Sequence, residues 1–241
     1  TDSESNAYHI WTGADQGIYM ARSTDSGDTW DSESIRISPA GVISTTFPQT
    51  DAGDPGRIAI TYLGSENVSL LNTTDIDGNN WNGNGHYAPS GVHYHLYVTY
   101  SLNALDEDPT FHTYRLSDDP VQIGSMCLNS GDCRTDDGGS NRNLLDFNDL
   151  TIDLDGRVYI AFADGCIDAC ATGNNSQPED SRAGRGSVYY MSSGPSLYVA
   201  KGDLVSPLPP AAESLNASTL PQICQAEQCR TEDQEVRMTD E

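Results

Sequence analysis

The sequence predicts an all-β protein built from short antiparallel strands. Short runs that alternate apolar and polar residues are separated by Gly, Asp, Asn and Pro, and no stretch has the apolar period of an amphipathic helix. A strand–turn–strand unit also occurs twice, because residues 47–62 align without a gap with residues 147–162. Phe, Gly, Arg, Ile and a terminal aromatic residue recur in phase in the two copies, which predicts two hairpins of the same design.

The predicted strands form three consecutive groups. Their residues are 7–12, 17–23 and 34–38; then 47–62 as a hairpin, 93–101 and 110–117; then 147–153, 157–163, 187–192 and 197–201. Residues 54–56 and 155–156 are the hairpin turns, where glycine supplies a positive φ. Residues 206–212 read as a proline-rich linker before a polar, acidic tail. We therefore divide the chain into a strand-rich unit, 1–204, and a linker with a tail or a further module, 205–241.

A turn motif lies between the second and third predicted strands. Residues 23–30 read S-x-D-x-G-x-T-W, with the matched positions occupied by Ser23, Asp25, Gly27, Thr29 and Trp30. Asp25 can accept backbone N–H bonds inside such a turn, and Gly27 can adopt a positive φ. The motif resembles the Asp-box of sialidase-like (BNR-repeat) β-propellers. This resemblance implies a partial propeller with about three four-stranded blades of six, followed by a disulfide-pinned tail.

The first group of strands lacks the innermost strand that a propeller blade needs. Exposed inner strands would be a pairing liability. We therefore expect the remaining blades to come from another chain or from an N-terminal segment.

The charge balance limits the classes of partner. Twelve basic residues face 36 acidic ones, which gives a net charge of −24. Such a charge opposes binding to nucleic acid and to anionic membranes, and it suits cation binding. No apolar run approaches the length needed to span a bilayer. We expect no nucleic-acid partner and no membrane insertion by this segment.

The cysteines and glycosylation sequons indicate an extracellular or cell-surface protein. The six cysteines form three close pairs, predicted as the disulfides Cys127–Cys133, Cys166–Cys170 and Cys224–Cys229. N-x-S/T sequons occur at Asn67, Asn72, Asn174 and Asn216. A zinc site is the competing interpretation, but no pair has C-x-x-C spacing and the histidines lie elsewhere.

The predicted ligand site lies in the long loops. Propeller geometry places residues 63–92, 118–146 and 164–186 on one face, opposite the short turns, and long loops are commonly functional. Arg142, Asp146, Asp149 and Asp164 flank the inner strands of the last group and are expected to converge there. They form either a ligand-binding cluster or a structural network of arginine and carboxylates.

Two functions follow from the resemblance. The stretch 142–166, with Cys127 and Cys133 before it, is similar to a segment of secreted sialidase-like proteins of uncertain activity. The first hypothesis is a surface module that binds a glycan or a protein. The second is an exo-sialidase-type glycoside hydrolase, which needs an arginine triad, a Tyr/Glu nucleophile pair and an Asp acid. That set is not assigned in this sequence, because the F/Y-R-I-P motif of the family is absent. Tyr198 is expected to pack within a strand rather than to act as the nucleophile. Arg57 and Arg157 are expected to be structural.

A metal site is predicted in one acidic, turn-rich segment, residues 74–81. Asp75 and Asp77 are expected to bind Ca²⁺ through oxygen ligands. The segment lacks the glutamate and the spacing of an EF-hand loop, so a degenerate Asp-box without a metal is the alternative. No other cofactor is predicted.

Overall fold

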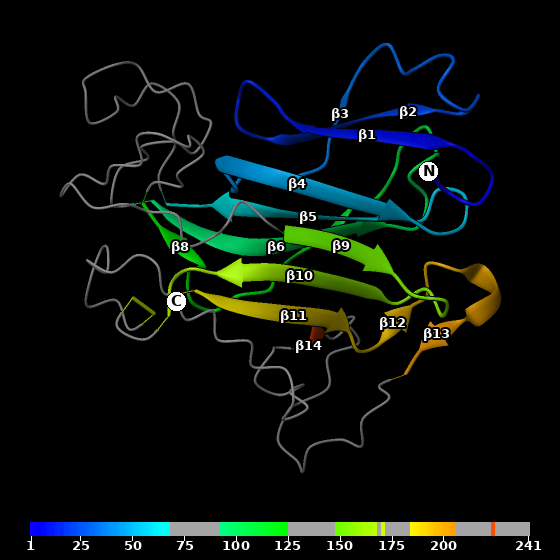
Figure 1. The fold of residues 1–241 in the computed structure, drawn as a ribbon. Coiled ribbons are helices and arrows are strands. Elements are labelled where there is room, and N and C mark those ends of the chain that lie inside the picture. The colour runs from blue at the N-terminus through cyan, green and yellow to red at the C-terminus, as the bar shows by residue number, and fades with distance from the viewer. Residues whose placement is uncertain (68–91, 125–147, 168–169, 172–183, 206–222, 225–241) are drawn as a thin grey trace, which may run out of the picture.

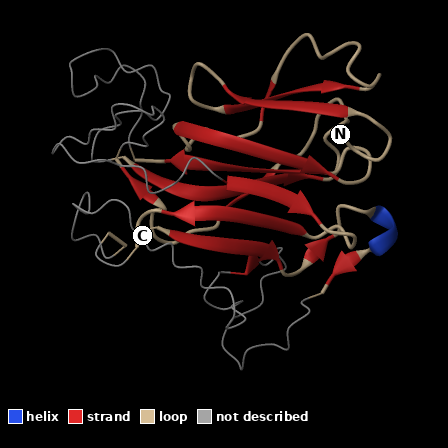
Figure 2. Ribbon diagram, viewed as in Figure 1, coloured by secondary structure: helices blue, strands red, loops and turns tan. Residues whose placement is uncertain are grey.

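The computed structural model describes residues 1–67, 92–124, 148–167, 170–171, 184–205 and 223–224. These residues form an all-β structure, as predicted, with three antiparallel sheets that lie one after another and remain open (Figures 1 and 2). A two-stranded ribbon and a single 3₁₀ turn complete the described elements. Within these ranges, no helix has the length and apolar character needed to cross a membrane.

The first sheet contains three strands in chain order. They are β1 (Ala7–Thr12), β2 (Ile18–Ser23) and β3 (Ile35–Arg36). Side chains alternate across a strand, so one face carries the buried Ile18 and Met20 and the other carries Tyr19. The prediction of three strands in residues 7–38 is confirmed.

The second sheet lies between the other two. Its strands are β4 (Ser44–Ala52), β5 (Ile58–Ser65), β6 (His93–Ser101) and β7 (His112–Arg115), and β8 (Gln122–Ile123) pairs with the start of β6. Every residue of β5 is buried. Ile58 and Ile60 pack toward the first sheet, whereas Ala59 and Leu63 pack toward the third. A strand covered on both faces reads as a nearly continuous apolar run, and β5 has that sequence.

The third sheet contains the second copy of the repeated hairpin. Its order is β9 (Asn148–Ile152), β10 (Val158–Asp164), β11 (Arg185–Met191) and β14 (Ile223–Cys224), with β9 and β14 at the edges. Ile160 and Phe162 face the second sheet and belong to the same apolar core as Leu96 and Val98 of β6. The strand β14 comes from the segment predicted as linker and tail, and the boundary at 204/205 stays a prediction.

The strand predicted at residues 197–201 is wrong. The segment instead forms the ribbon of β12 (Gly194–Pro195) and β13 (Asp203–Leu204), with the 3₁₀ turn Val199–Lys201 between them. The physical reason is that the Leu197 amide and carbonyl and the Ser196 carbonyl form hydrogen bonds with the two hairpin turns, while the Ser196 amide donates to the Gly202 carbonyl. These groups are therefore not available to pair with a neighbouring strand.

The turn at residues 23–30 lies between β2 and β3, as predicted, and is closed by its own side chains. The hydroxyl of Ser23 accepts a hydrogen bond from the Gly27 amide at 2.8 Å, and the Asp25 carboxylate accepts one from the Thr29 amide at 2.8 Å. The Thr29 hydroxyl donates a further bond to Asp25. The two bonds from Thr29, together with one from the Ser23 hydroxyl, lower the pKa of Asp25 to about 2. Gly27 has a φ of 98°. Trp30 is 44 % exposed and donates from Nε1 to the Gly27 carbonyl.

The two repeated hairpins have matching turns. The amide of Gly53 donates to the Arg57 carbonyl at 2.9 Å, and the amide of Asp153 donates to the Arg157 carbonyl at 3.0 Å. The glycine before each arginine has a positive φ, 76° at Gly56 and 80° at Gly156. The gapless sequence repeat therefore corresponds to a repeated backbone conformation.

A bridge formed by Ser196 and Leu197 joins these two turns. The Leu197 carbonyl accepts the Asp54 amide at 2.9 Å, and the Leu197 amide donates to the Gly156 carbonyl at 3.0 Å. The Ser196 carbonyl accepts the Arg57 guanidinium at 2.5 Å, and the Ser196 hydroxyl donates to the Asp155 carbonyl at 2.6 Å. The bridge ties the second sheet to the third.

Replacing Gly53 with alanine is expected to lower the free energy of unfolding. A Cβ atom at Gly53 would lie 2.2 Å from the Leu197 carbonyl oxygen, so the bridge would have to move. Overpacking of this kind costs about 1–3 kcal/mol. The measurement is a denaturant or thermal unfolding curve of Gly53→Ala. Gly186→Ala is the control, because a Cβ there meets nothing within 4 Å; equal stabilities for the two variants would contradict the prediction.

Candidate functional site

The end of the molecule opposite the bridge is where the sheets meet the long connections. The Val121 amide donates to the Tyr94 carbonyl at 2.8 Å, and the Gly165 amide donates to the Val121 carbonyl at 2.9 Å. The start of β6, the segment before β8 and the end of β10 are therefore held side by side (Figure 1, left). This is the end at which the sequence predicted the ligand site, and it is the end at which Asp164 lies.

Asp164 is a carboxyl group in this region whose pKa is strongly raised. It is the last residue of β10 and pairs across the strands with Arg185. Burial raises the pKa of Asp164 to about 7, and the nearby Asp119 carboxylate adds to the rise. The Cys166 amide, which donates to Oδ1 at 3.1 Å, and the Arg185 guanidinium act in the opposite direction. Near neutral pH, this carboxyl group can hold or release a proton.

A disulfide fixes the chain directly after Asp164. Cys166 and Cys170 are bonded, with their Cα atoms 5.0 Å apart, which confirms this predicted pair. Both cysteines are buried and pack with Ile123 of β8. The bond therefore restrains the exit from β10. Of the other predicted pairs, Cys127, Cys133 and Cys229 lie outside the described residues, while Cys224 is the last residue of β14.

The structure separates the two described members of the predicted cluster. Asp149 is exposed on β9 and pairs with Ala161, which is exposed as well. Asp164 follows Ala161 by three residues, so strand alternation places it on the opposite face of the third sheet, with Phe162. Arg142 and Asp146 lie outside the described residues, and their part in the cluster stays a prediction.

Asp119 and Arg185 are not among the residues predicted for the site. Asp119 follows β7 and is distant from Asp164 along the chain, so only the tertiary contact between Gly165 and Val121 brings it near. Arg185 could have been found only from the pairing of β10 with β11, in which it lies opposite Asp164. That register could not be deduced from the sequence, since the connection between these two strands is long.

The arginines that follow the hairpin turns have structural partners, in agreement with the prediction. Arg157 donates to the carbonyl of Met191 and, at 3.0 Å, to that of Val205, and its guanidinium lies over the Tyr190 ring. Arg57 belongs to the bridge. Tyr198 lies just before the 3₁₀ turn rather than within a strand, so its expected strand position is wrong.

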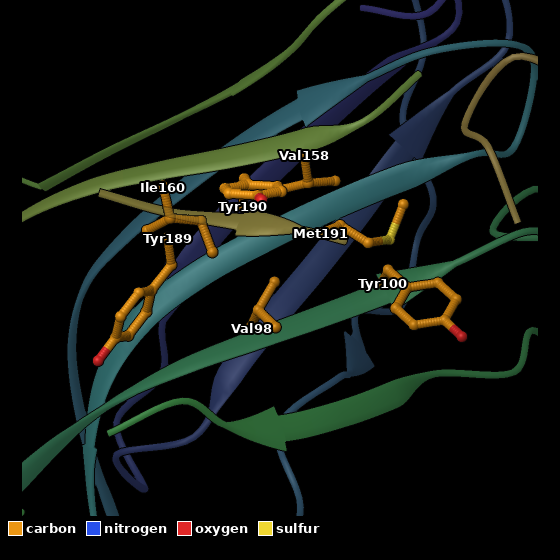
Figure 3. Close-up of a pocket in the computed structure, with 7 residues that line it drawn as sticks. All are labelled: Val98, Tyr100, Val158, Ile160, Tyr189, Tyr190 and Met191. Carbon is orange, nitrogen blue, oxygen red and sulfur yellow. The ribbon is translucent and has the colours of Figure 1, made fainter. Parts of the chain in front are cut away.

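A pocket between the second and third sheets is apolar and belongs to the core. Side chains from β6, β10 and β11 line it (Figure 3): Val98, Tyr100, Val158, Ile160, Tyr189, Tyr190 and Met191. Its position between two packed sheets indicates a packing defect rather than a binding site.

The remaining predicted sites fall largely outside the described residues. This applies to Asp75 and Asp77, the predicted Ca²⁺ ligands, and to the sequons at Asn72, Asn174 and Asn216. Asn67 is exposed, and its side-chain oxygen accepts hydrogen bonds from the Ser65 hydroxyl and the His93 amide. Within the described ranges, no group of three or more His, Cys, Asp or Glu residues is arranged to hold a metal ion.

Comparison with known proteins identifies no family. No protein-family model matches the chain, and no curated protein matches it. Among solved structures, the chain is similar to a crystal structure of a protein of unknown function from Dyadobacter fermentans, with 13 % identity and a TM-score of 0.38. The match covers 75 % of this chain and 41 % of that one, so the chain spans less than half of its length.

Replacing Asp164 with asparagine is expected to stabilise the fold at alkaline pH and to have little effect near pH 4. The raised pKa means that the folded state binds the Asp164 proton more tightly than the unfolded state. Stability therefore falls as the pH rises from about 4 to about 7, by at most about 4 kcal/mol for this group. Asparagine keeps an oxygen for the Cys166 amide and carries no charge.

Unfolding curves of both proteins from pH 4 to pH 8 test this expectation. The difference in unfolding free energy should grow with pH in favour of Asp164→Asn. A constant difference across this range would show that folding does not raise the pKa of Asp164.

Proposed function

We propose that this chain is a ligand-binding module of the sialidase-like β-propeller type, which binds a glycan or a protein partner through the end that carries Asp164. The observation that carries the proposal is the asymmetry of the two ends. The short hairpin turns at one end are engaged in structural contacts, whereas the Asp164 carboxyl group lies at the other end, where the strands that flank the long connections begin or end.

Two features support a propeller of this type. The turn at residues 23–30 combines the S-x-D-x-G-x-T-W sequence with the side-chain hydrogen bonds that this sequence can make. The two copies of the repeat form matching hairpins in successive sheets, and β4 and β9, the first strands of these hairpins, lie against each other. Repeated four-stranded units of this kind are how propellers are built.

An oxidising, extracellular or cell-surface location is part of the proposal. The Cys166–Cys170 disulfide supports it, because such bonds persist in secreted proteins. The net charge of −24 also suits a soluble surface module, and it disfavours an anionic ligand unless arginines offset the repulsion locally.

A glycoside hydrolase is the alternative, and Asp164 favours it. A carboxylic acid that stays protonated near neutral pH is what general-acid catalysis of glycoside cleavage requires. Asp164, with a pKa of about 7, has that property. A hydrolase also needs a second carboxylate or a tyrosine nucleophile facing the acid. Asp149 projects from the opposite face of the sheet, so Asp119 is the described carboxylate near Asp164. The arginine clamp and the tyrosine nucleophile of a sialidase are not assigned among the described residues, and we therefore propose binding without hydrolysis.

Glycan binding without hydrolysis is the expected result for the wild-type protein. The measurement is a set of titrations with N-acetyllactosamine and its α2,3-sialylated form, together with the release of methylumbelliferone from 4-methylumbelliferyl N-acetylneuraminate. Binding should be lost in Arg142→Ala at an unchanged melting temperature. A lower melting temperature with unchanged binding would instead assign Arg142 to the structural network.

Turnover of the fluorogenic substrate that disappears in Asp164→Asn would favour the hydrolase. If neither glycan binds and no substrate is cleaved, the glycan ligand is wrong and a protein partner remains as the proposed ligand.

A further inference from the structure

The outer face of the first sheet carries a row of aromatic rings. His9, Trp11 and Tyr19 project from β1 and β2 away from the second sheet, while Ile18 and Met20 project toward it. The ring centroids of His9 and Trp11 are 5.2 Å apart, and those of Trp11 and Tyr19 are 6.2 Å apart, both in stacked arrangements. Trp30 extends the row, with its ring perpendicular to His9 at 6.2 Å.

One end of this row is capped by a guanidinium group. Arg36 of β3 lies over the Tyr19 ring, 5.8 Å from its centroid, and is held there by an ion pair with Asp15. The third sheet repeats the arrangement, because Arg157 lies 5.7 Å from the centroid of Tyr190, which stacks on Tyr159. The chain thus uses the same cap twice: a stacked aromatic pair covered by arginine.

The other end of the row, at His9 and Trp30, is open. In the described part of the chain, arginines cover Tyr19 and Tyr190, and none covers Trp30. Trp30 is 44 % exposed, and His9 is exposed too. Tryptophan is the aromatic residue that attracts cations most strongly.

The composition and charge of this face favour a cationic partner. The faces that pack between the sheets are largely aliphatic, as Ile18, Ile58 and Ile60 illustrate. The outer face is instead aromatic and polar, and the segment that carries Trp30 exposes Asp28 and Glu33. Arg36 is already neutralised by Asp15, and the whole chain has a charge of −24. Both the aromatic faces and the surrounding field therefore attract positive charge.

We propose that this aromatic face, formed by His9, Trp11, Tyr19 and Trp30, is a docking surface for a protein partner that places arginine side chains against Trp30 and His9. The surface is separate from the end that carries Asp164, so it is independent of the glycan site proposed above. In the proposed propeller this is the face that a further blade would cover, and the partner then occupies the place of that blade. Arginine fits better than lysine, because a planar guanidinium stacks on a ring and is more weakly hydrated than an ammonium group. Arg36 on Tyr19 is the intramolecular precedent.

The test compares two peptides of equal charge. Acetylated tetra-arginine amide and acetylated tetra-lysine amide are titrated into the full chain by calorimetry at about 0.15 M salt, where long-range attraction is screened. General attraction to an acidic protein would bind both peptides equally. Stacking on the aromatic face predicts that tetra-arginine binds about threefold or more tightly than tetra-lysine.

Variants that leave the net charge unchanged locate the preference. Trp30→Leu is expected to abolish the difference between the two peptides, and His9→Ala is expected to reduce it. Val188→Ala is the matched control, because Val188 is 46 % exposed but lies on the third sheet, and it should keep the full preference. If Trp30→Leu opens its turn, which would show as a lowered melting temperature, His9→Ala decides the question.

Three results would overturn the proposal. One is equal affinity of the wild-type chain for the two peptides. Another is an arginine preference that survives both Trp30→Leu and His9→Ala. The last is binding of a neutral oligosaccharide such as N-acetyllactosamine in place of an arginine preference. Such binding would quench tryptophan fluorescence in the wild-type chain and not in Trp30→Leu. That result would make the face a glycan surface.

Discussion

The fold depends on the close approach of one backbone segment to two hairpin turns. Ser196 and Leu197 hydrogen-bond to the turn of the second sheet on one side and to the turn of the third on the other. The approach requires glycine, because a Cβ atom at Gly53 or Gly156 would lie 2.2 Å or less from the bridge. Gly156 therefore meets a packing requirement between sheets as well as a requirement of turn conformation. In the first hairpin these requirements fall on two glycines, because Gly53 approaches the bridge and Gly56 has the positive φ.

The first sheet is tied to the same end of the molecule. The hydroxyl of Tyr8 on β1 donates to the buried Asp2 carboxylate at 2.7 Å and accepts the Gly56 amide at 3.0 Å. All three sheets are thus fixed around the Gly53–Arg57 turn of the second sheet, whose four amides all donate hydrogen bonds within the protein. The opposite end carries a carboxyl group, Asp164, whose ionised form is disfavoured by burial. Such local destabilisation is common where a protein binds or reacts.

The sequence was sufficient for features that local patterns determine and insufficient for those that tertiary contacts determine. Alternation and turn residues located β1, β6 and the repeated hairpins, because a half-buried strand and a glycine turn leave direct marks in the sequence. The strand β14 could not be predicted, since only its partner β11 defines it. The segment at 197–201 has residues typical of a strand, but the backbone amide and carbonyl of Leu197 form hydrogen bonds with the two hairpin turns instead. Asp119 and Asp164 share no sequence pattern and meet only through the packing of two sheets.

The described arginines are engaged within the protein, and this limits what the chain can attract. Arg22, Arg36, Arg57, Arg115, Arg157 and Arg185 each lie next to a carboxylate or donate to backbone carbonyls. Arg22 is typical, since it pairs with Asp31 and donates to two carbonyls of the connection between β6 and β7, those of Ala104 and Asp106. The arginine that would pair with an anionic ligand is therefore expected outside the described ranges. Arg142 of the predicted site is the candidate. A cationic partner needs no such group, because an excess of carboxylates and the exposed ring of Trp30 already favour it.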